Sequence, residues 1–253
     1  MGTSLSQLLL RSARAYPLRP ALAIGERVVA DYATLATRVA AIAGGLRGDC
    51  GLAENDRVAL VMKNCTQYVE LLLACWHAGL AAVPVNAKLH PRELEFILEN
   101  SGARLCFVTP DLAGGVEPIA GRVRTLEQVI DAEGPRYAAL ARSTSMAPAE
   151  RDANDIAWLF YTSGTTGRPK GVMITHRNLY TLTGCYFSDV DSVAPGDSIL
   201  HAAPMSHGSG LYIPPHIAHA ALNVVPESGG FDPAEIYSPV SYTHLRAHET
   251  RED

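Results

Sequence analysis

The segment from Tyr161 to Gly171 combines the residue types that proteins use to bind polyphosphates. In order it reads Tyr161, Thr162, Ser163, Gly164, Thr165, Thr166, Gly167, Arg168, Pro169, Lys170 and Gly171. Its glycines let the backbone approach a ligand closely, and the successive N–H groups of such a loop form a concave donor surface for anions. The Ser and Thr hydroxyls add hydrogen-bond donors, while Arg168 and Lys170 supply positive charge. The segment therefore predicts a polyphosphate-binding loop.

Two familiar phosphate-binding loops have other spacings. The P-loop needs four residues between its first Gly and the Gly-Lys pair, followed by Ser or Thr, whereas Gly171 follows Lys170 here. The dinucleotide sequence G-x-G-x-x-G is absent, and no helix is expected to open directly from the loop. The apolar runs 156–160 and 172–174 instead predict a strand on each side. A flexible Ser/Thr/Gly linker is the alternative, but linkers rarely lie between two apolar strands.

Composition limits the class of protein. The chain has 253 residues, of which 47% are apolar and 19% charged, as expected for an ordinary soluble globular protein with a substantial core. Its formal net charge of −5 argues against nucleic acid as a partner. Five scattered cysteines without C-x-x-C spacing predict neither a disulfide framework nor a zinc site, and favour a cytoplasmic location. The apolar region 69–85 contains Glu70 and His77, so it predicts a buried helix and strand rather than a membrane span.

Alternating strands and helices predict an α/β fold with layered parallel sheets and flanking helices. The expected strands are 21–24 and 27–30, paired as a hairpin, then 57–62, 81–85, 104–108, 198–202 and 222–225. Helices are expected to start at Asp31 and Thr66 as N-caps, at His90-Pro91, and near Thr175, with ends at Gly79 and Gly102 for the second and third. Residues 141–155 predict a connecting loop between two α/β layers, of which the second starts at Ile156.

Three segments follow from this pattern. Residues 1–150 are predicted to form a first α/β subdomain, and residues 151–237 a second, incomplete one that carries the phosphate-binding loop. Residues 238–253 lack both periodicity and family resemblance, and predict a non-native or disordered tail. A genuine divergent terminus is the alternative for that tail. His244 and His248 lie four residues apart within it, but a chance arrangement explains them better than a metal site.

As a whole, Tyr161–Gly171 resembles the phosphate-binding loop of the adenylate-forming, or AMP-binding, superfamily. That superfamily includes acyl-CoA synthetases, peptide-synthetase adenylation domains and luciferases. Asp31-Tyr32 with Leu35, and the region 64–89, resemble two weaker family motifs in the same order, although ordinary core packing would produce similar patterns. The segment Pro204–Gly210 resembles the family segment that lines the carboxylate-substrate pocket. The resemblance implies the N-terminal part of the large domain of an adenylate-forming enzyme.

The resemblance also implies roles for individual residues. The residues implied to bind ATP are Thr162, Ser163, Gly164, Thr165, Thr166, Gly167 and Lys170. Their hydroxyls would bond the β- and γ-phosphates, the glycines would permit close approach, and Lys170 would offset charge alongside Mg²⁺. His207 with Gly208 is implied on the substrate side, with a solvent-exposed turn histidine as the alternative. His176 matches the family too, but is expected to brace the start of a helix.

The implied function is that of a fragment of an ATP-dependent ligase. It would activate a small carboxylic acid or fatty acid as an acyl-adenylate, and then form a thioester with CoA as co-substrate, a reaction of fatty acid metabolism. Complete members continue into a hinge and a C-terminal domain with the catalytic lysine, so we expect the chain alone to be inactive and assign no catalytic residue. The alternatives are a non-catalytic nucleotide-binding module, a peptide-synthetase-type adenylation domain fragment, and an unrelated phosphotransferase. The phosphotransferase is disfavoured because no acidic metal motif accompanies the loop.

Overall fold

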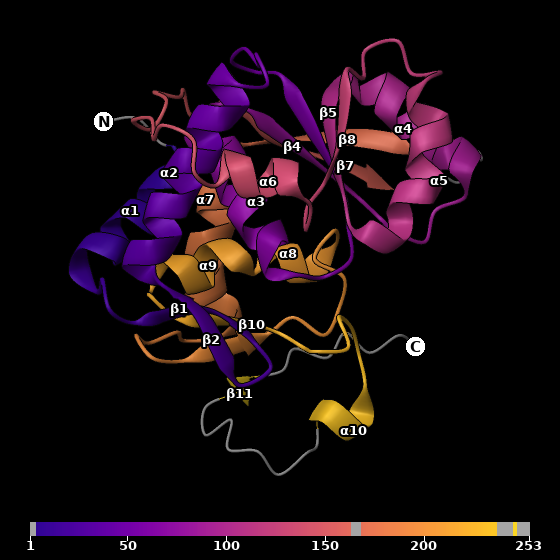
Figure 1. Ribbon diagram of the computed structural model, residues 1–253. Helices are drawn as coiled ribbons and strands as arrows, with labels where there is room; N and C mark the ends of the chain where they lie inside the picture. Colours follow the sequence, from indigo (N-terminus) through magenta and orange to yellow (C-terminus); the bar gives the residue numbers. More distant parts are fainter. Residues whose placement is uncertain (1–3, 163–167, 237–244, 247–253) are drawn as a thin grey trace.

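The computed structural model describes residues 4–162, 168–236 and 245–246, which form two β-sheets surrounded by helices (Figure 1). The larger sheet has six strands in the order β6 (Gln128–Asp131), β5 (Ala103–Val108), β3 (Arg57–Val61), β4 (Ala81–Val85), β7 (Ile156–Thr162) and β8 (Lys170–Thr175). The smaller sheet has the order β11 (Leu245–Arg246), β9 (Ser198–Leu200), β10 (Leu222–Val225), β1 (Pro20–Ile24) and β2 (Arg27–Asp31).

Helices cover both faces of the larger sheet, with α3 on one face and α4 and α5 on the other (Figure 1). The helices of the described ranges are α1 (Ser6–Ala15), α2 (Tyr32–Gly48), α3 (Thr66–His77), α4 (Pro91–Ser101), α5 (Pro110–Ala120), α6 (Pro135–Leu140), α7 (His176–Cys185), α8 (Gly208–Leu211), α9 (Ile213–Ala218) and α10 (Pro233–Ile236). A short π-helix, Tyr186–Val190, continues α7. None of the helices in the described ranges combines the length and hydropathy needed to cross a membrane.

The larger sheet is parallel from β6 to β7, and β8 runs antiparallel to β7 at the edge. Strand β3 is apolar at successive positions because its two faces are both buried. Val58 and Leu60 pack in the core with α2 and α3, whereas Ala59 and Val61 pack in the core with α4 and α5. Side chains of a strand point alternately to opposite faces, so a strand between two helical layers needs no polar face. The predicted α/β fold with parallel sheets and flanking helices is confirmed.

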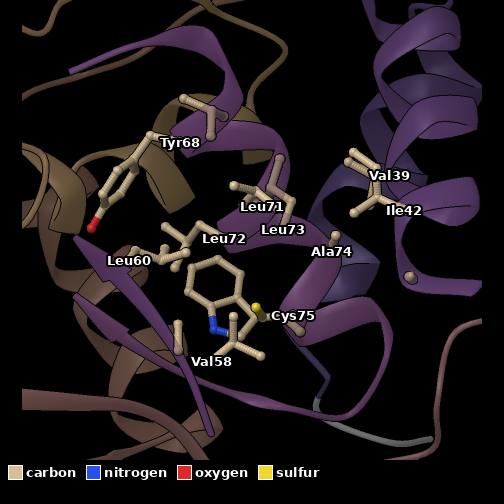
Figure 2. Packing of buried hydrophobic residues seen from close by; sticks show 14 of the residues in the cluster. Val39, Ile42, Val58, Leu60, Tyr68, Leu71, Leu72, Leu73, Ala74 and Cys75 are labelled. Atoms are coloured by element: carbon tan, nitrogen blue, oxygen red, sulfur yellow. The ribbon is translucent and has the colours of Figure 1, made fainter. Parts of the chain in front are cut away.

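Helix α3 lies between β3 and α2, which explains why it is apolar on nearly all sides (Figure 2). Figure 2 shows Val58 and Leu60 on one side of it, and Val39 and Ile42 on the other. The charge of Glu70 on this helix is balanced by Arg38, whose Nε lies 2.6 Å from Oε1, and by a hydrogen bond from the Tyr137 hydroxyl. This pairing satisfies the carboxylate in a buried position, and the region 69–85 is a buried helix and strand as predicted.

The smaller sheet joins segments that are far apart in the sequence. Strands β1 and β2 form the predicted antiparallel hairpin, and β1 lies parallel to β10, with Leu22 opposite Asn223. In the larger sheet, β7 lies parallel to β4. Each sheet therefore takes strands from both sides of residue 150, so the sheets are not divided as the sequence segments are. The division into segments 1–150 and 151–237 stays a prediction.

Residues 141–155 form the predicted irregular connection, and they lie against the helices. Met146 N donates to the Ala40 carbonyl of α2 at 3.2 Å, and Ala149 N donates to the His77 carbonyl of α3 at 2.8 Å. The connection leads into β7, which belongs to the same sheet as β3 and β4. Of the predicted tail 238–253, Leu245 and Arg246 pair with β9, and its other residues lie outside the described part. The nature of the tail stays a prediction.

Most predicted helix ends are confirmed, and one is wrong. Asp31 caps α2 by accepting from Thr34 N at 2.7 Å, and Gly102 ends α4 in the left-handed conformation at φ 63°. Thr66 is not an N-cap, because Cys65 holds the extended cap conformation and Thr66 is the first helical residue. The Thr66 hydroxyl instead lies 3.3 Å from Oε1 of Gln67.

Candidate functional site

The predicted phosphate-binding loop is carried by the hairpin of β7 and β8. The strands pair from Ile156 opposite Thr175 to Thr162 opposite Lys170, so Thr162 and Lys170 stand at the end of the hairpin that carries the loop. Both residues are exposed, as is Arg168. The strands on each side of the loop are therefore confirmed. The remaining predicted ATP-binding residues, namely Ser163, Gly164, Thr165, Thr166 and Gly167, lie outside the described residues.

Tyr161 anchors the loop end of this hairpin to helix α4. Its hydroxyl donates to Oδ1 of Asn100 at 2.8 Å. Across the hairpin, Gly171 stands opposite Tyr161, and a Cβ added at Gly171 would lie 3.0 Å from Cζ of the tyrosine ring. Because Gly171 has no side chain, there is room for the ring of Tyr161. The start of the loop is held by a side chain as well as by the strand ladder.

The predicted substrate-side residue His207 lies in a compact turn between β9 and α8. His207 N donates to the Pro204 carbonyl at 3.0 Å, and Gly210 N donates to the His207 carbonyl at 3.1 Å. A methyl group added at Gly210 would overlap with the Met205 carbonyl oxygen, whereas a Cβ added at Gly208 would meet no atom within 4 Å. The turn thus needs a glycine at position 210, and it leaves open space at Gly208 beside the exposed His207.

An aromatic contact brings the two parts of the candidate site together. The imidazole ring of His207 lies edge-on to the ring of Phe160, with 5.1 Å between centroids and 62° between planes. Phe160 is on β7, two residues before Thr162. The strand that leads into the predicted phosphate loop therefore also supports the predicted substrate-side histidine. Residue spacing alone gave no sign of this contact.

His176 is placed as predicted, away from any open site. It is the first residue of α7, is fully buried, and its Nδ1 accepts from Leu5 N at 3.2 Å. Burial, together with the nearby charge of Arg151, lowers the pKa of His176 to about 4. Thr175 in front of it caps the helix together with Asn178. His176 thus joins the N-terminal segment to the start of α7, and holds no position from which it could contact a substrate.

Sequence reasoning missed Asn64, which follows β3. Its Nδ2 donates to the carbonyls of His201 and Ala203, at 2.7 and 2.8 Å, and its Oδ1 accepts from Met205 N at 2.8 Å. A polar residue at the carboxyl end of a buried parallel strand was the available signal, because that edge is where α/β sheets place functional side chains. A cleft of about 430 Å³ opens beside Asn64, between the start of α3 and segments 132–138 and 225–229.

A second group that the sequence did not reveal is centred on His201. Its Nδ1 lies 2.7 Å from Oγ of Ser209, and its Nε2 lies 3.0 Å from Oδ1 of Asn223. All three side chains are buried, and burial lowers the pKa of His201 to about 4. The imidazole is therefore neutral at physiological pH, and it bridges the end of β9 to α8 and β10.

Comparison with known proteins now identifies the family. A family model described as AMP-binding enzyme matches residues 9–244. The chain belongs to the AMP-binding enzyme family. The match covers the hairpin of β7 and β8 and the His207 turn, and it runs into the segment 238–253. The resemblance seen in the sequence is thereby confirmed, and so is the place of the fold among adenylate-forming enzymes.

Curated AMP-binding relatives are about twice as long or more. A feruloyl-CoA synthase from Amycolatopsis sp. is 35% identical over 235 residues, which is 91% of this chain and 45% of that protein. A long-chain-fatty-acid–CoA ligase, FadD13 from Mycobacterium tuberculosis, is 33% identical over 166 residues, which is 64% of this chain and 32% of that protein. The chain thus spans less than half the length of these relatives.

Solved structures of AMP-binding enzymes superpose over nearly the whole chain. The inhibitor-bound N-terminal domain of FACL13 from Mycobacterium tuberculosis has a TM-score of 0.82 at 27% identity, and the match covers 93% of this chain and 59% of that one. The ATP-bound structure of MatB from Rhodopseudomonas palustris has a TM-score of 0.78 at 27% identity, and covers 93% of this chain and 47% of that one.

Proposed function

We propose that this chain is part of an enzyme that activates a carboxylic acid with ATP and transfers the acyl group to the thiol of coenzyme A. The observation that carries the proposal is the contact between Phe160 and His207, because it sets an acid-side turn against the strand that leads into a nucleotide loop. Membership of the AMP-binding family supports the use of ATP. Relatives named as feruloyl-CoA synthase, 3-hydroxybenzoate–CoA ligase and long-chain-fatty-acid–CoA ligase support an acid and CoA as the other substrates.

On the nucleotide side, Thr162 and Lys170 are the described ends of the loop, and both are exposed. In our proposal, the hydroxyls of Thr162, Ser163, Thr165 and Thr166 donate to the β- and γ-phosphates. Gly164 and Gly167 let the backbone approach the phosphates, and the Lys170 ammonium offsets their charge. The side chains would thus fix the triphosphate in the orientation that exposes its α-phosphorus.

On the acid side, His207 is the proposed contact. Its imidazole is exposed and supported from behind by Phe160, and an imidazole N–H can donate to a carboxylate oxygen. Gly208 beside it has open space where a Cβ would stand. An acid of appreciable size could therefore lie along this turn without meeting a side chain at that position.

The proposed reaction has two steps. A carboxylate oxygen attacks the α-phosphorus of ATP, an O–P bond forms, and the bond to the β-phosphate breaks with release of pyrophosphate. The thiol of CoA, after losing its proton, then attacks the acyl carbon, a C–S bond forms, and AMP leaves. Two anions must meet in the first step, so positioning and charge neutralisation dominate its barrier. Lys170 and the loop hydroxyls supply part of that neutralisation.

The side chains of the β7–β8 hairpin limit how this segment could contact Mg²⁺. Neither β7 nor β8 contains a carboxylate, and the described residues hold no group of three His, Cys, Asp or Glu side chains that could bind a metal ion. In our proposal, the groups of this segment that could contact an ATP-bound Mg²⁺ would be the loop hydroxyls. The ion would add positive charge beside the phosphates, where the chain itself offers Arg168 and Lys170.

The proposal is tested by ATP–pyrophosphate exchange in the complete protein that carries this chain. A panel of aliphatic and aromatic carboxylic acids should contain at least one that drives exchange, and CoA should then yield its thioester. Lys170→Met should lower kcat/KM for ATP on the order of 100-fold, because a charge-assisted contact to the phosphates is lost. Lys88→Met removes an exposed lysine outside the hairpin and should leave the rate unchanged.

Two outcomes would contradict the proposal. One is saturable ATP binding without exchange for any acid, which would indicate a nucleotide-binding module. The other is equal activity of the Lys170→Met and Lys88→Met variants.

A further inference from the structure

The side chain of Asn64 holds three backbone groups of the segment that leads to His207. Its Nδ2 donates to the His201 and Ala203 carbonyls, and its Oδ1 accepts from Met205 N, at 2.7 to 2.8 Å. The two carbonyls and one N–H also fix which way the carboxamide is turned, because the opposite orientation would place its oxygen against both carbonyl oxygens. One side chain thus replaces the strand partner that this segment lacks after β9 ends.

The same segment is closed from its other end by His201. The contact between His201 Nδ1 and Ser209 Oγ, 2.7 Å long, joins the first and last residues of the stretch 201–209. Asn223 of β10 holds the second ring nitrogen at 3.0 Å. The stretch is therefore tied to β3 through Asn64 and to the smaller sheet through His201. Between these two attachments, His207 is the exposed residue whose ring rests on Phe160.

We infer that Asn64 is a positioning residue for the acid-binding turn. It acts through the backbone of residues 201–205 and does not touch substrate itself. The inference rests on the function proposed above, since it requires His207 to face the acid. Removing the two donors of Asn64 leaves the carbonyls of His201 and Ala203 without these partners, so the turn can shift relative to β7. The nucleotide side should be affected far less, because Thr162 and Lys170 are held by the hairpin ladder.

The test uses Asn64→Asp, which keeps the shape and the acceptor but removes both donors. The matched control is Asn154→Asp, the same chemical change at an exposed residue of the 141–155 connection. In the complete protein, Asn64→Asp should raise KM for the acid at least tenfold and leave KM for ATP within twofold. Ser209→Ala opens the turn at its other attachment, so it should also raise KM for the acid and leave KM for ATP within twofold.

Amide hydrogen exchange of the peptide 201–209 provides a readout that does not depend on activity. Amide exchange at Met205 should be at least tenfold faster in Asn64→Asp than in the parent or in Asn154→Asp. The oxygen that accepts from Met205 N then belongs to a carboxylate, which the carbonyl oxygens of His201 and Ala203 repel. Unchanged protection at Met205 overturns the inference, and so does an equal rise of both KM values. If no acid supports ATP–pyrophosphate exchange in the parent, the proposed function fails and the positioning role for an acid fails with it. Faster amide hydrogen exchange at Met205 would then show only that Asn64 holds the turn.

If Asn64→Asp does not fold, Asn64→Ala, which removes the same two donors without adding a charge, is examined by the same two measurements. Unchanged KM for the acid and unchanged protection of the peptide in a folded Asn64→Ala protein would also overturn the inference.

Discussion

The ring of His207 meets the ring of Phe160 edge-on, at 5.1 Å between centroids. Phe160 belongs to a strand whose last residue, Thr162, begins the phosphate-loop segment. A single strand thus supports the two regions that must cooperate if an acid is to react with ATP. Phe160 and Thr162 are two residues apart on this strand, so the rise of a β-strand, about 3.3 Å per residue, sets the spacing between the two regions.

The ring contact predicts an energetic coupling between the two residues. A double-mutant cycle of Phe160→Ala and His207→Ala should give a coupling free energy of roughly 0.5–1.5 kcal/mol, as expected for an edge-to-face pair. Urea unfolding of the four proteins measures it. Strictly additive effects would show that the rings are only neighbours.

Two glycines of helix α2 predict opposite effects of the same substitution. A methyl group at Gly44 would overlap with the Thr144 carbonyl oxygen of the 141–155 connection, whereas at Gly48 it would meet no atom within 4 Å. Gly48→Ala should therefore stabilise the fold by about 0.5–1 kcal/mol through helix propensity. Gly44→Ala should destabilise it by about 2 kcal/mol or more, because a backbone segment must move.

Thermal or urea unfolding of both single variants checks this prediction. If Gly44→Ala is as stable as Gly48→Ala, the connection does not lie against α2 in solution.

The pairing of Gly171 with Tyr161 predicts that the cost of Gly171→Ala depends on the tyrosine ring. Gly171→Ala places a Cβ about 3 Å from the Tyr161 ring, so the ring must shift and its hydrogen bond to Asn100 is strained. We expect a loss of about 1–2 kcal/mol in unfolding free energy. In a Tyr161→Ala background the obstacle is gone, and the same substitution should cost nothing. A penalty of equal size in both backgrounds would exclude the steric explanation.

Two buried histidines predict a loss of stability in mild acid. Burial lowers the pKa of His176 and of His201 to about 4, from the usual 6.5. Between these values the unfolded chain binds a proton that the folded chain does not, so the unfolding free energy falls as the pH drops from 6.5 towards 4. The loss should reach roughly 3 kcal/mol for each histidine.

Denaturant unfolding at pH 7, 6 and 5 measures this slope. His176→Gln removes one titrating group and should flatten the slope, although Asp155 and Arg151 beside it still contribute charge. An unfolding free energy that stays constant from pH 7 to pH 5 would contradict the assignment of both imidazoles as neutral.

Local features of the fold could be predicted from sequence because their signals lie within a few residues. The short apolar strands 21–24 and 27–30, only two residues apart, indicated the β1–β2 hairpin. Asp31 and Gly102 marked helix ends by side-chain capping and a left-handed backbone. The glycine-rich loop could likewise be placed between two strands. Thr66 failed as a cap because Ser and Thr favour both the cap and the first turn, and sequence does not say where the extended chain first turns.

Pairings between distant segments could not be predicted in this way. Nothing in the apolar run of β10 indicates that it lies beside β1, and β7 was expected to start a second layer but lies beside β4. Parallel pairing is decided by packing on both faces of a sheet, and an apolar strand fits many neighbours equally well. The reach of Asn64 to the His207 turn depends on those pairings, so it could be seen only in three dimensions.

The parallel pairing of β1 with β10 has a consequence for biosynthesis. Leu22 and its partner Asn223 are separated by about 200 residues, which a ribosome needs on the order of 10–40 s to add at 5–20 residues per second. During that interval the nascent hairpin of β1 and β2 has an unpaired inner edge, open to any passing strand. The inner edge of β1 therefore stays without its native partner until translation has passed Val225.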